Sequence, residues 1–289
     1  MTQIGERAIV AWPLLVAKTS IFGTAMFALL PGPPPQVEGV TYALTPLWRG
    51  LTLLAVLLSP LALLVGTANM VESSPLAAIP FVPQVVRYTH FGHVWSWSFP
   101  LTLALFVIAW TPGRGPLKTG ALGIVASVLV LLVSFSSHAI DRGRLALIVY
   151  FIHEAAAALW IGAILGFWFG AVRGKLGPEW IQRTAPTVSN IAGCAVATIL
   201  LSGLYTAYYS LDGDPHRLID SAYGRTLVEK VFVAMLVLLI GAYNRYCLIP
   251  AISHSSAQKR LLQNVGIESL LLIGVLGLAA QLGNTPPAH

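Results

Sequence analysis

The chain has 289 residues, of which 56% are hydrophobic and 10% charged, and its formal net charge is +6. Ordinary soluble domains carry about a quarter charged residues, so a soluble enzyme, a secreted disulfide scaffold and a disordered chain are excluded. The 17 Lys and Arg residues stand singly or in twos and threes between long apolar stretches, which argues against nucleic acid as a partner. The composition predicts a protein whose solvent is the lipid bilayer.

A membrane-spanning helix needs roughly 20 mostly apolar residues, and eight stretches of the chain meet this requirement. In chain order they cover about 8–30, 48–69, 91–110, 118–138, 145–172, 185–210, 226–248 and 262–282. The longer connectors, about 31–47, 70–90 and 211–225, contain Pro and Gly turn signals. We expect an all-α polytopic membrane protein with about eight transmembrane helices, forming a single integral membrane domain over 1–289.

A short pattern recurs four spans apart. Thr89-His90-Phe91-Gly92-His93 leads into the third stretch, and Ala222-Tyr223-Gly224-Arg225 leads into the seventh. Two copies of four helices would be parallel repeats related by an axis along the membrane normal, an arrangement known in transporters. The shared aromatic-glycine pair leaves open an organisation as two four-helix repeats.

The basic residues indicate an orientation, because cytoplasmic loops carry an excess of Lys and Arg. The side that holds both termini has six: Arg7, Arg87, Arg142, Arg144, Arg217 and Arg225. The opposite side has nine: Arg49, Arg114, Lys118, Arg173, Lys175, Arg183, Arg245, Lys259 and Arg260. We therefore expect both termini to lie outside the cytoplasm.

Five of the seven histidines fall on the outer half of this topology: His90, His93, His138, His153 and His216. Ionisable side chains at membrane depth are costly and usually face a bundle interior or a wet cavity. His90 and His93 are three residues apart and share a helix face. His153 lies about eight residues deeper than His138, roughly 12 Å along the helix. A shallow set of His90, His93 and His138 above His153 fits a relay better than a single site.

Imidazole is a good ligand for copper and zinc and the usual axial ligand of b-type haem. Each histidine could instead be a satisfied polar group bonded to a neighbouring helix. A haem would need two histidines on facing helices, which His93 and His138 could provide but His138 and His153 could not. A copper-binding structural or sensory subunit without transport is a further alternative.

Four other charged residues lie within the expected spans: Lys18, Glu154, Lys230 and Glu268. A structural pairing of Glu154 or Glu268 with Lys18 is one interpretation. The other is a charge relay that carries a cation, or protons moving against it, past the midplane. The two cysteines, Cys194 and Cys247, lie in separate apolar segments without a CxxC spacing, so we expect buried structural thiols.

The chain resembles the copper resistance protein D family of bacterial inner-membrane proteins, mainly over 130–287. The resemblance rests on these motifs, in this order: Ser137-His138-Ala139, His153 with Ala155-Ala156, Trp160-Ile161-Gly162, Ser202-Gly203-Leu204-Tyr205, Tyr223-Gly224-Arg225-Thr226-Leu227 with Lys230, Asn244-Arg245 with Pro250, Glu268, and Thr285-Pro286-Pro287.

The resemblance implies a non-enzymatic protein of the bacterial inner membrane, with both termini in the periplasm, that imports copper ions. It also implies a periplasmic copper-binding partner of the copper resistance C type, which would be a separate protein here. The first half of the family is variable, so His90 and His93 depend on the spacing argument. We expect His90, His93 and His138 to receive the ion, and His153 to pass it on with Glu154 balancing its charge. Glu268 would then lie near the exit.

Overall fold

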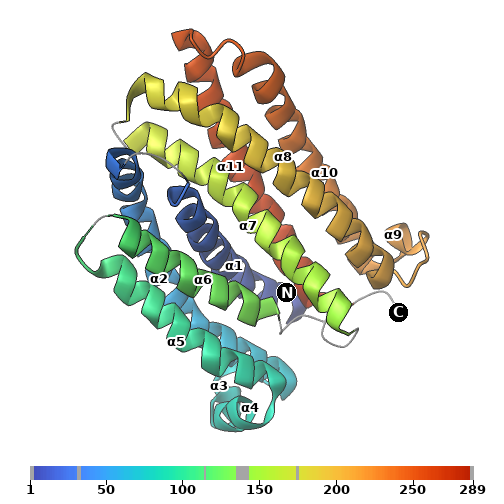
Figure 1. Cartoon of the computed structure of the whole chain (residues 1–289). Coiled ribbons are helices and arrows are strands. Elements are labelled where there is room, and N and C mark those ends of the chain that lie inside the picture. The colour runs from blue at the N-terminus through green and yellow to red at the C-terminus, as the bar shows by residue number, and fades with distance from the viewer. Residues whose placement is uncertain (1–2, 31–33, 114, 135–142, 174–175, 287–289) are drawn as a thin grey trace.

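The computed structural model describes residues 3–30, 34–113, 115–134, 143–173 and 176–286. Within these ranges the regular elements are all helices, and the long ones run side by side as a bundle (Figure 1). The same ranges hold seven helices long and apolar enough to cross a membrane. These are α1 (Gln3–Ala28), α2 (Pro34–Met70), α5 (His90–Trp110), α7 (Arg144–Arg173), α8 (Gly177–Ser210), α10 (Ala222–Tyr243) with the π-helical η3 (Asn244–Leu248), and α11 (Ser255–Asn284).

The remaining long helix, α6 (Pro116–Ser134), is apolar but shorter in its described part. With it, the helices correspond one to one with the eight stretches expected from the sequence. The expected class, an all-α polytopic membrane protein, is confirmed. Short helices occupy two of the connectors: α3 (Pro75–Ala78), η1 (Ile79–Phe81), α4 (Val82–Tyr88) and α9 (Arg217–Asp220).

The expectation of a connector over 31–47 is wrong for most of that range, because α2 already begins at Pro34. Proline is tolerated in the first turn of a helix, where its missing N–H has no partner to lose. Pro46 lies inside the helix. Beside it, the Thr45 hydroxyl donates to the Thr41 carbonyl at 2.7 Å, one way in which neighbouring hydroxyls help proline-containing helices to persist in membranes.

The crossing of α1 and α7 brings two backbones into direct contact. A Cβ added to Gly23 would lie 1.8 Å from the Ala158 carbonyl oxygen, and one added to Gly162 would lie 1.9 Å from the Gly23 carbonyl carbon. Only glycine fits such an approach, the device by which membrane helices associate closely. Because α1 also packs against α2, α6 and α11, this crossing ties the two halves of the chain together.

The helix pairing supports two four-helix repeats with one difference between them. In the first half α1 packs against α2 and α5 against α6; in the second, α7 packs against α8 and α10 against α11. In the first half α2 also packs against α5. The equivalent pair α8 and α10, both fully described, is not among the helix pairs whose backbones make several close contacts. We therefore call the first half closed and the second half open at this position, meaning that the backbones of α8 and α10 approach less closely than those of α2 and α5.

The two repeats enter their third helix through the same junction. The Thr89 hydroxyl accepts from the Gly92 N–H at 3.0 Å, and the Ser221 hydroxyl accepts from the Gly224 N–H at 2.8 Å. Both hydroxyls also donate to the carbonyl four residues earlier, at 2.7 and 2.6 Å. A Cβ on either glycine would lie 2.1 Å from a carbonyl oxygen of the preceding short helix. Gly92 and Gly224 thus occupy equivalent positions.

Candidate functional site

His153 is held by a hydrogen bond across the α7–α8 pair. Its Nδ1 lies 3.0 Å from the Ser202 hydroxyl oxygen, and that hydroxyl donates its own hydrogen to the Thr198 carbonyl at 2.6 Å. Since a hydroxyl has one hydrogen, Ser202 accepts from His153 Nδ1–H. In the neutral imidazole this leaves the lone pair on Nε2, the arrangement in which a second residue orients a metal-binding histidine.

This histidine belongs to a linked set of charged and phenolic groups from α7 and α10. Glu154 interacts electrostatically with Tyr150 and with Lys230, and Lys230 also acts on His153. We call this group the outer cluster, meaning only that it lies toward the end of the bundle that holds the termini: Tyr150, His153, Glu154, Ser202, Tyr223 and Lys230. Its carboxylate and ammonium have opposite charges, so each offsets part of the cost of burying the other.

Neither Glu154 nor Glu268 forms an ion pair with Lys18 among the described residues. The opposite charge that acts on Glu154 is Lys230.

The two repeats differ at the position of Lys230. Lys230 follows Gly224 by six residues in α10, and the residue that follows Gly92 by six in α5 is Ser98, which is buried. A small neutral side chain therefore stands in the closed half where a lysine stands in the open half.

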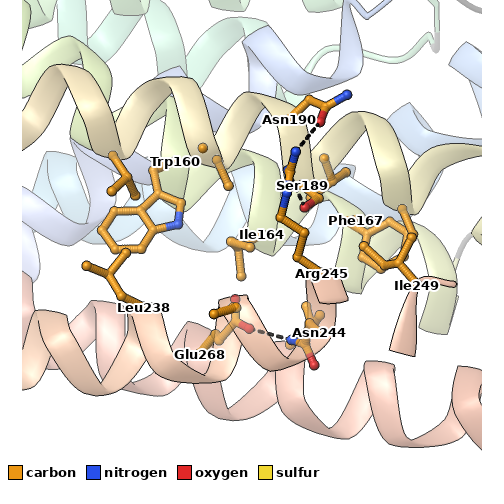
Figure 2. Close-up of a pocket in the computed structure, with 18 of the residues that line it drawn as sticks. Trp160, Ile164, Phe167, Ser189, Asn190, Leu238, Asn244, Arg245, Ile249 and Glu268 are labelled. Atoms are coloured by element: carbon orange, nitrogen blue, oxygen red, sulfur yellow. Dashed lines mark hydrogen bonds between the residues drawn. The ribbon is translucent and has the colours of Figure 1, made fainter. Parts of the chain in front are cut away.

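A cavity of about 510 Å³ lies between α7, α8, α10 and α11, in the half of the bundle away from the two termini. Its walls are mostly apolar, with Trp160 and Phe167 among them, and its polar groups include Asn244, Arg245 and Glu268 (Figure 2). This size and this mixture are typical of binding sites for small ligands. The cavity lies between α8 and α10, whose backbones approach less closely than those of α2 and α5.

Glu268 is 2% exposed and takes part in a chain of hydrogen bonds in the cavity wall. Asn244 Nδ2 donates to Glu268 Oε1 at 2.5 Å, and Asn264 Nδ2 donates to Asn244 Oδ1 at 2.7 Å. The other carboxyl oxygen of Glu268 points toward Ile164 and the cavity (Figure 2). The two asparagines therefore fix one oxygen and leave the other facing the cavity.

Arg245 connects η3 to α8 at the end of the bundle away from the termini. Its Nη1 donates to the Ser189 hydroxyl at 2.9 Å and its Nη2 to Asn190 Oδ1 at 3.1 Å. The side chain leaves η3 toward α8 and away from Glu268 (Figure 2). π-helical turns such as η3 are rare and are frequent at functional sites, and here the turn presents Asn244 and Arg245 to two different partners.

The structure does not bring all the predicted histidines together. His90 and His93 are exposed at the start of α5, which packs in the first half, whereas His153 lies in the second half. His138 lies outside the described residues. Within the described ranges no three histidine, cysteine or acidic side chains are grouped to hold a metal ion.

His93 also has a structural contact. Its Nε2 lies 2.8 Å from the Arg87 carbonyl oxygen, six residues earlier. In the second repeat, Arg225 Nη1 donates to the Ile219 carbonyl, again six residues earlier, at 3.3 Å. His93 and Arg225 are equivalent by position, and both bind a carbonyl at the end of the preceding short helix.

The expectation of buried cysteines is wrong, because Cys194 and Cys247 are both free and exposed. Both lie on the outside of the bundle, where apolar surface can face lipid. Cys194 also lines the cavity at its edge.

Sequence reasoning did not assign sites to Ser202, Asn264 or Ser189, because each acts through a partner on a helix distant in sequence. The available signal is a polar residue inside an apolar span. Asn264 is such a residue, since interhelical hydrogen bonds are the usual role of a membrane asparagine.

The fold and these interior groups define a polytopic α-helical membrane protein with ionisable residues inside its second four helices. Family models match two parts of the chain: "Copper resistance protein D" over residues 182–282 and "Copper resistance protein D-like, N-terminal domain" over residues 7–147. Together they span most of the sequence, and the chain belongs to the copper resistance protein D family.

Two curated relatives agree with this assignment. Copper resistance protein D of Pseudomonas syringae pv. tomato is 24% identical over 286 residues, with 92% of each chain covered. Inner membrane protein YebZ of Escherichia coli (strain K12) is 26% identical over 179 residues, with 59% of each chain covered. No solved structure matches the chain significantly.

Proposed function

We propose that this protein binds copper at outward-facing histidines and carries it inward across the bacterial inner membrane. The observation that carries the proposal is the open α8–α10 pair, which has the His153 cluster on its outer part and the Glu268 cavity on its inner part. In the closed half, the equivalent helices α2 and α5 pack against each other. A path for a cation is more easily formed between α8 and α10, where the helices approach less closely and a cavity lies between them.

In this proposal the ion enters through His90, His93 and His138 and reaches Nε2 of His153. Ser202 keeps the ring in the tautomer that binds metal, and Glu154 with Lys230 adjusts the local charge as the cation arrives. Glu268 faces the ion in the inner cavity. Basic residues are in excess on the side of the membrane opposite the termini, which supports termini in the periplasm. A separate periplasmic copper-binding protein of the copper resistance C type would then deliver the ion at the end that holds the termini.

The test is copper uptake into proteoliposomes by the wild type and by His153→Ala and Ser202→Ala. We expect His153→Ala to lose uptake at least about tenfold, equal to 1.4 kcal/mol of transition-state or binding free energy. Ser202→Ala should lose less, because it frees the ring without removing it. The matched control is His254→Ala, an exposed histidine at the start of α11, which should leave uptake unchanged.

Unchanged uptake in His153→Ala would refute the assigned path. An absorption spectrum of the same purified protein, oxidised and then reduced, distinguishes the haem alternative. A Soret band with sharp reduced bands would overturn the copper proposal in favour of electron transfer.

A further inference from the structure

The two interior carboxylates differ in their surroundings. Glu154 has the Lys230 ammonium beside it, whereas Glu268 forms no ion pair among the described residues. The difference matters because an isolated ionised carboxylate is very costly in a low-dielectric interior, and such a group becomes neutral or acquires a cation.

Two cations on neighbouring elements could in principle compensate Glu268. Arg245, on η3, turns toward α8 and binds Ser189 and Asn190 instead (Figure 2). Lys18, on α1, lies six residues inward of Trp12, whose indole donates to the Ile273 carbonyl at 2.9 Å on α11. Glu268 lies five residues inward of Ile273, so the two groups have similar depths. They nevertheless form no ion pair in the described structure.

Other charged groups on the helices around Glu268 are remote along the chain. On α11 itself, Lys259 and Arg260 are exposed near the inner end, more than two turns from Glu268. On α7 and α10, Glu154 and Lys230 belong to the outer cluster and interact with each other. When no cation is bound beside it, the described residues leave a proton as the group that can neutralise Glu268.

We infer that Glu268 is a proton-for-cation exchange site of the inner cavity. When a cation enters, the O–H bond of the Glu268 carboxyl breaks and the proton leaves to water at the cavity mouth. The resulting carboxylate balances one positive charge of the cation. When the cation departs, a proton returns to the carboxylate, and no electrons are exchanged. This inference rests on the proposed function, since it takes copper as the cation.

The hydrogen-bond chain suits both states of the site. Asn244 Nδ2 donates to Glu268 Oε1 at 2.5 Å, and an oxygen of a carboxyl or a carboxylate can accept that bond. Asn264 in turn fixes Asn244 by donating to its Oδ1 at 2.7 Å. The exchange can therefore take place at the other oxygen, which faces the cavity, while the side chain keeps its position.

The experiment is infrared difference spectroscopy on the full-length protein in lipid bilayers, with and without cuprous ions, together with the proton release measured in weak buffer. Glu268→Gln keeps the shape and the acceptor for Asn244 but cannot exchange a proton. Glu179→Gln is the control, because Glu179 is exposed at the start of α8 and paired with Arg183.

We expect the wild type and the control to show a protonated-carboxyl C=O band that disappears when copper is added, with one proton released at this site. Glu268→Gln should lack the band and release one proton fewer per copper bound. A wild-type spectrum without a band that depends on Glu268, or equal proton release by wild type and Glu268→Gln, would overturn the inference. Proteoliposomes that take up no copper would refute the proposed function instead, and the metal-free band would still report on the proton at Glu268.

Discussion

The α1–α7 crossing yields a quantitative prediction. In Gly162→Ala the new Cβ would lie 1.9 Å from the Gly23 carbonyl carbon, whereas real Cβ atoms essentially never approach other atoms within 3.0 Å. The backbones must separate by at least the difference, 1.1 Å. A gap of about 0.5–1 Å already forfeits a quarter to a half of the dispersion energy of the atoms that it parts.

Overpacking of this kind typically costs about 1–3 kcal/mol, and the upper end applies here because the three nearest obstructing atoms all belong to the backbone of Gly23. The expected loss of about 3 kcal/mol corresponds to roughly a 100-fold fall in the folding equilibrium constant. The measurement is unfolding in mixed micelles of increasing denaturing detergent, followed by tryptophan fluorescence.

The control for Gly162→Ala is Gly274→Ala, where an added Cβ has nothing within 4 Å. Both substitutions gain the same helix propensity, about 0.8–1 kcal/mol relative to glycine, so the difference between them isolates the contact. Equal unfolding midpoints for the two variants would refute the close crossing.

Two further predictions concern the repeated junction. Thr89→Ala and Ser221→Ala should each destabilise the protein by about 1 kcal/mol in thermal melts, because each removes the same helix cap; clearly unequal losses would contradict the equivalence of the two junctions. His93→Ala should also melt earlier, by about 1 kcal/mol, since it loses the bond to the Arg87 carbonyl, whereas His93→Gln keeps a donor and should melt like the wild type. An unchanged melt for His93→Ala would leave the histidine with no capping role.

The membrane-spanning helices could be predicted from the sequence, because each is recognised by the composition of one continuous segment. A segment of about 20 apolar residues crosses the bilayer as a helix, because only a helix satisfies its backbone hydrogen bonds within the segment. The sequence therefore located all eight stretches. Helix ends were less predictable: α2 begins at Pro34, well before the apolar stretch, because the proline-rich segment is compatible with a first helical turn.

The site was predictable only in part. His153, Glu154, Lys230 and Glu268 could be identified as charges at membrane depth, and the structure places three of them in one cluster. The partner of each could not be derived from the sequence. Ser202 meets His153 from 49 residues away, and such pairings depend on how helices rotate and cross.

The less close approach of α8 and α10, compared with α2 and α5, has a consequence for how such a protein can evolve. Tandem duplication of a four-helix unit gives one chain two copies of the same frame inside the bilayer. Once α2 and α5 maintain close packing in one copy, the other copy is released from that constraint and can accept charges such as Lys230 in place of a small residue such as Ser98. Asymmetry, and with it a division of labour, can then evolve within a single gene.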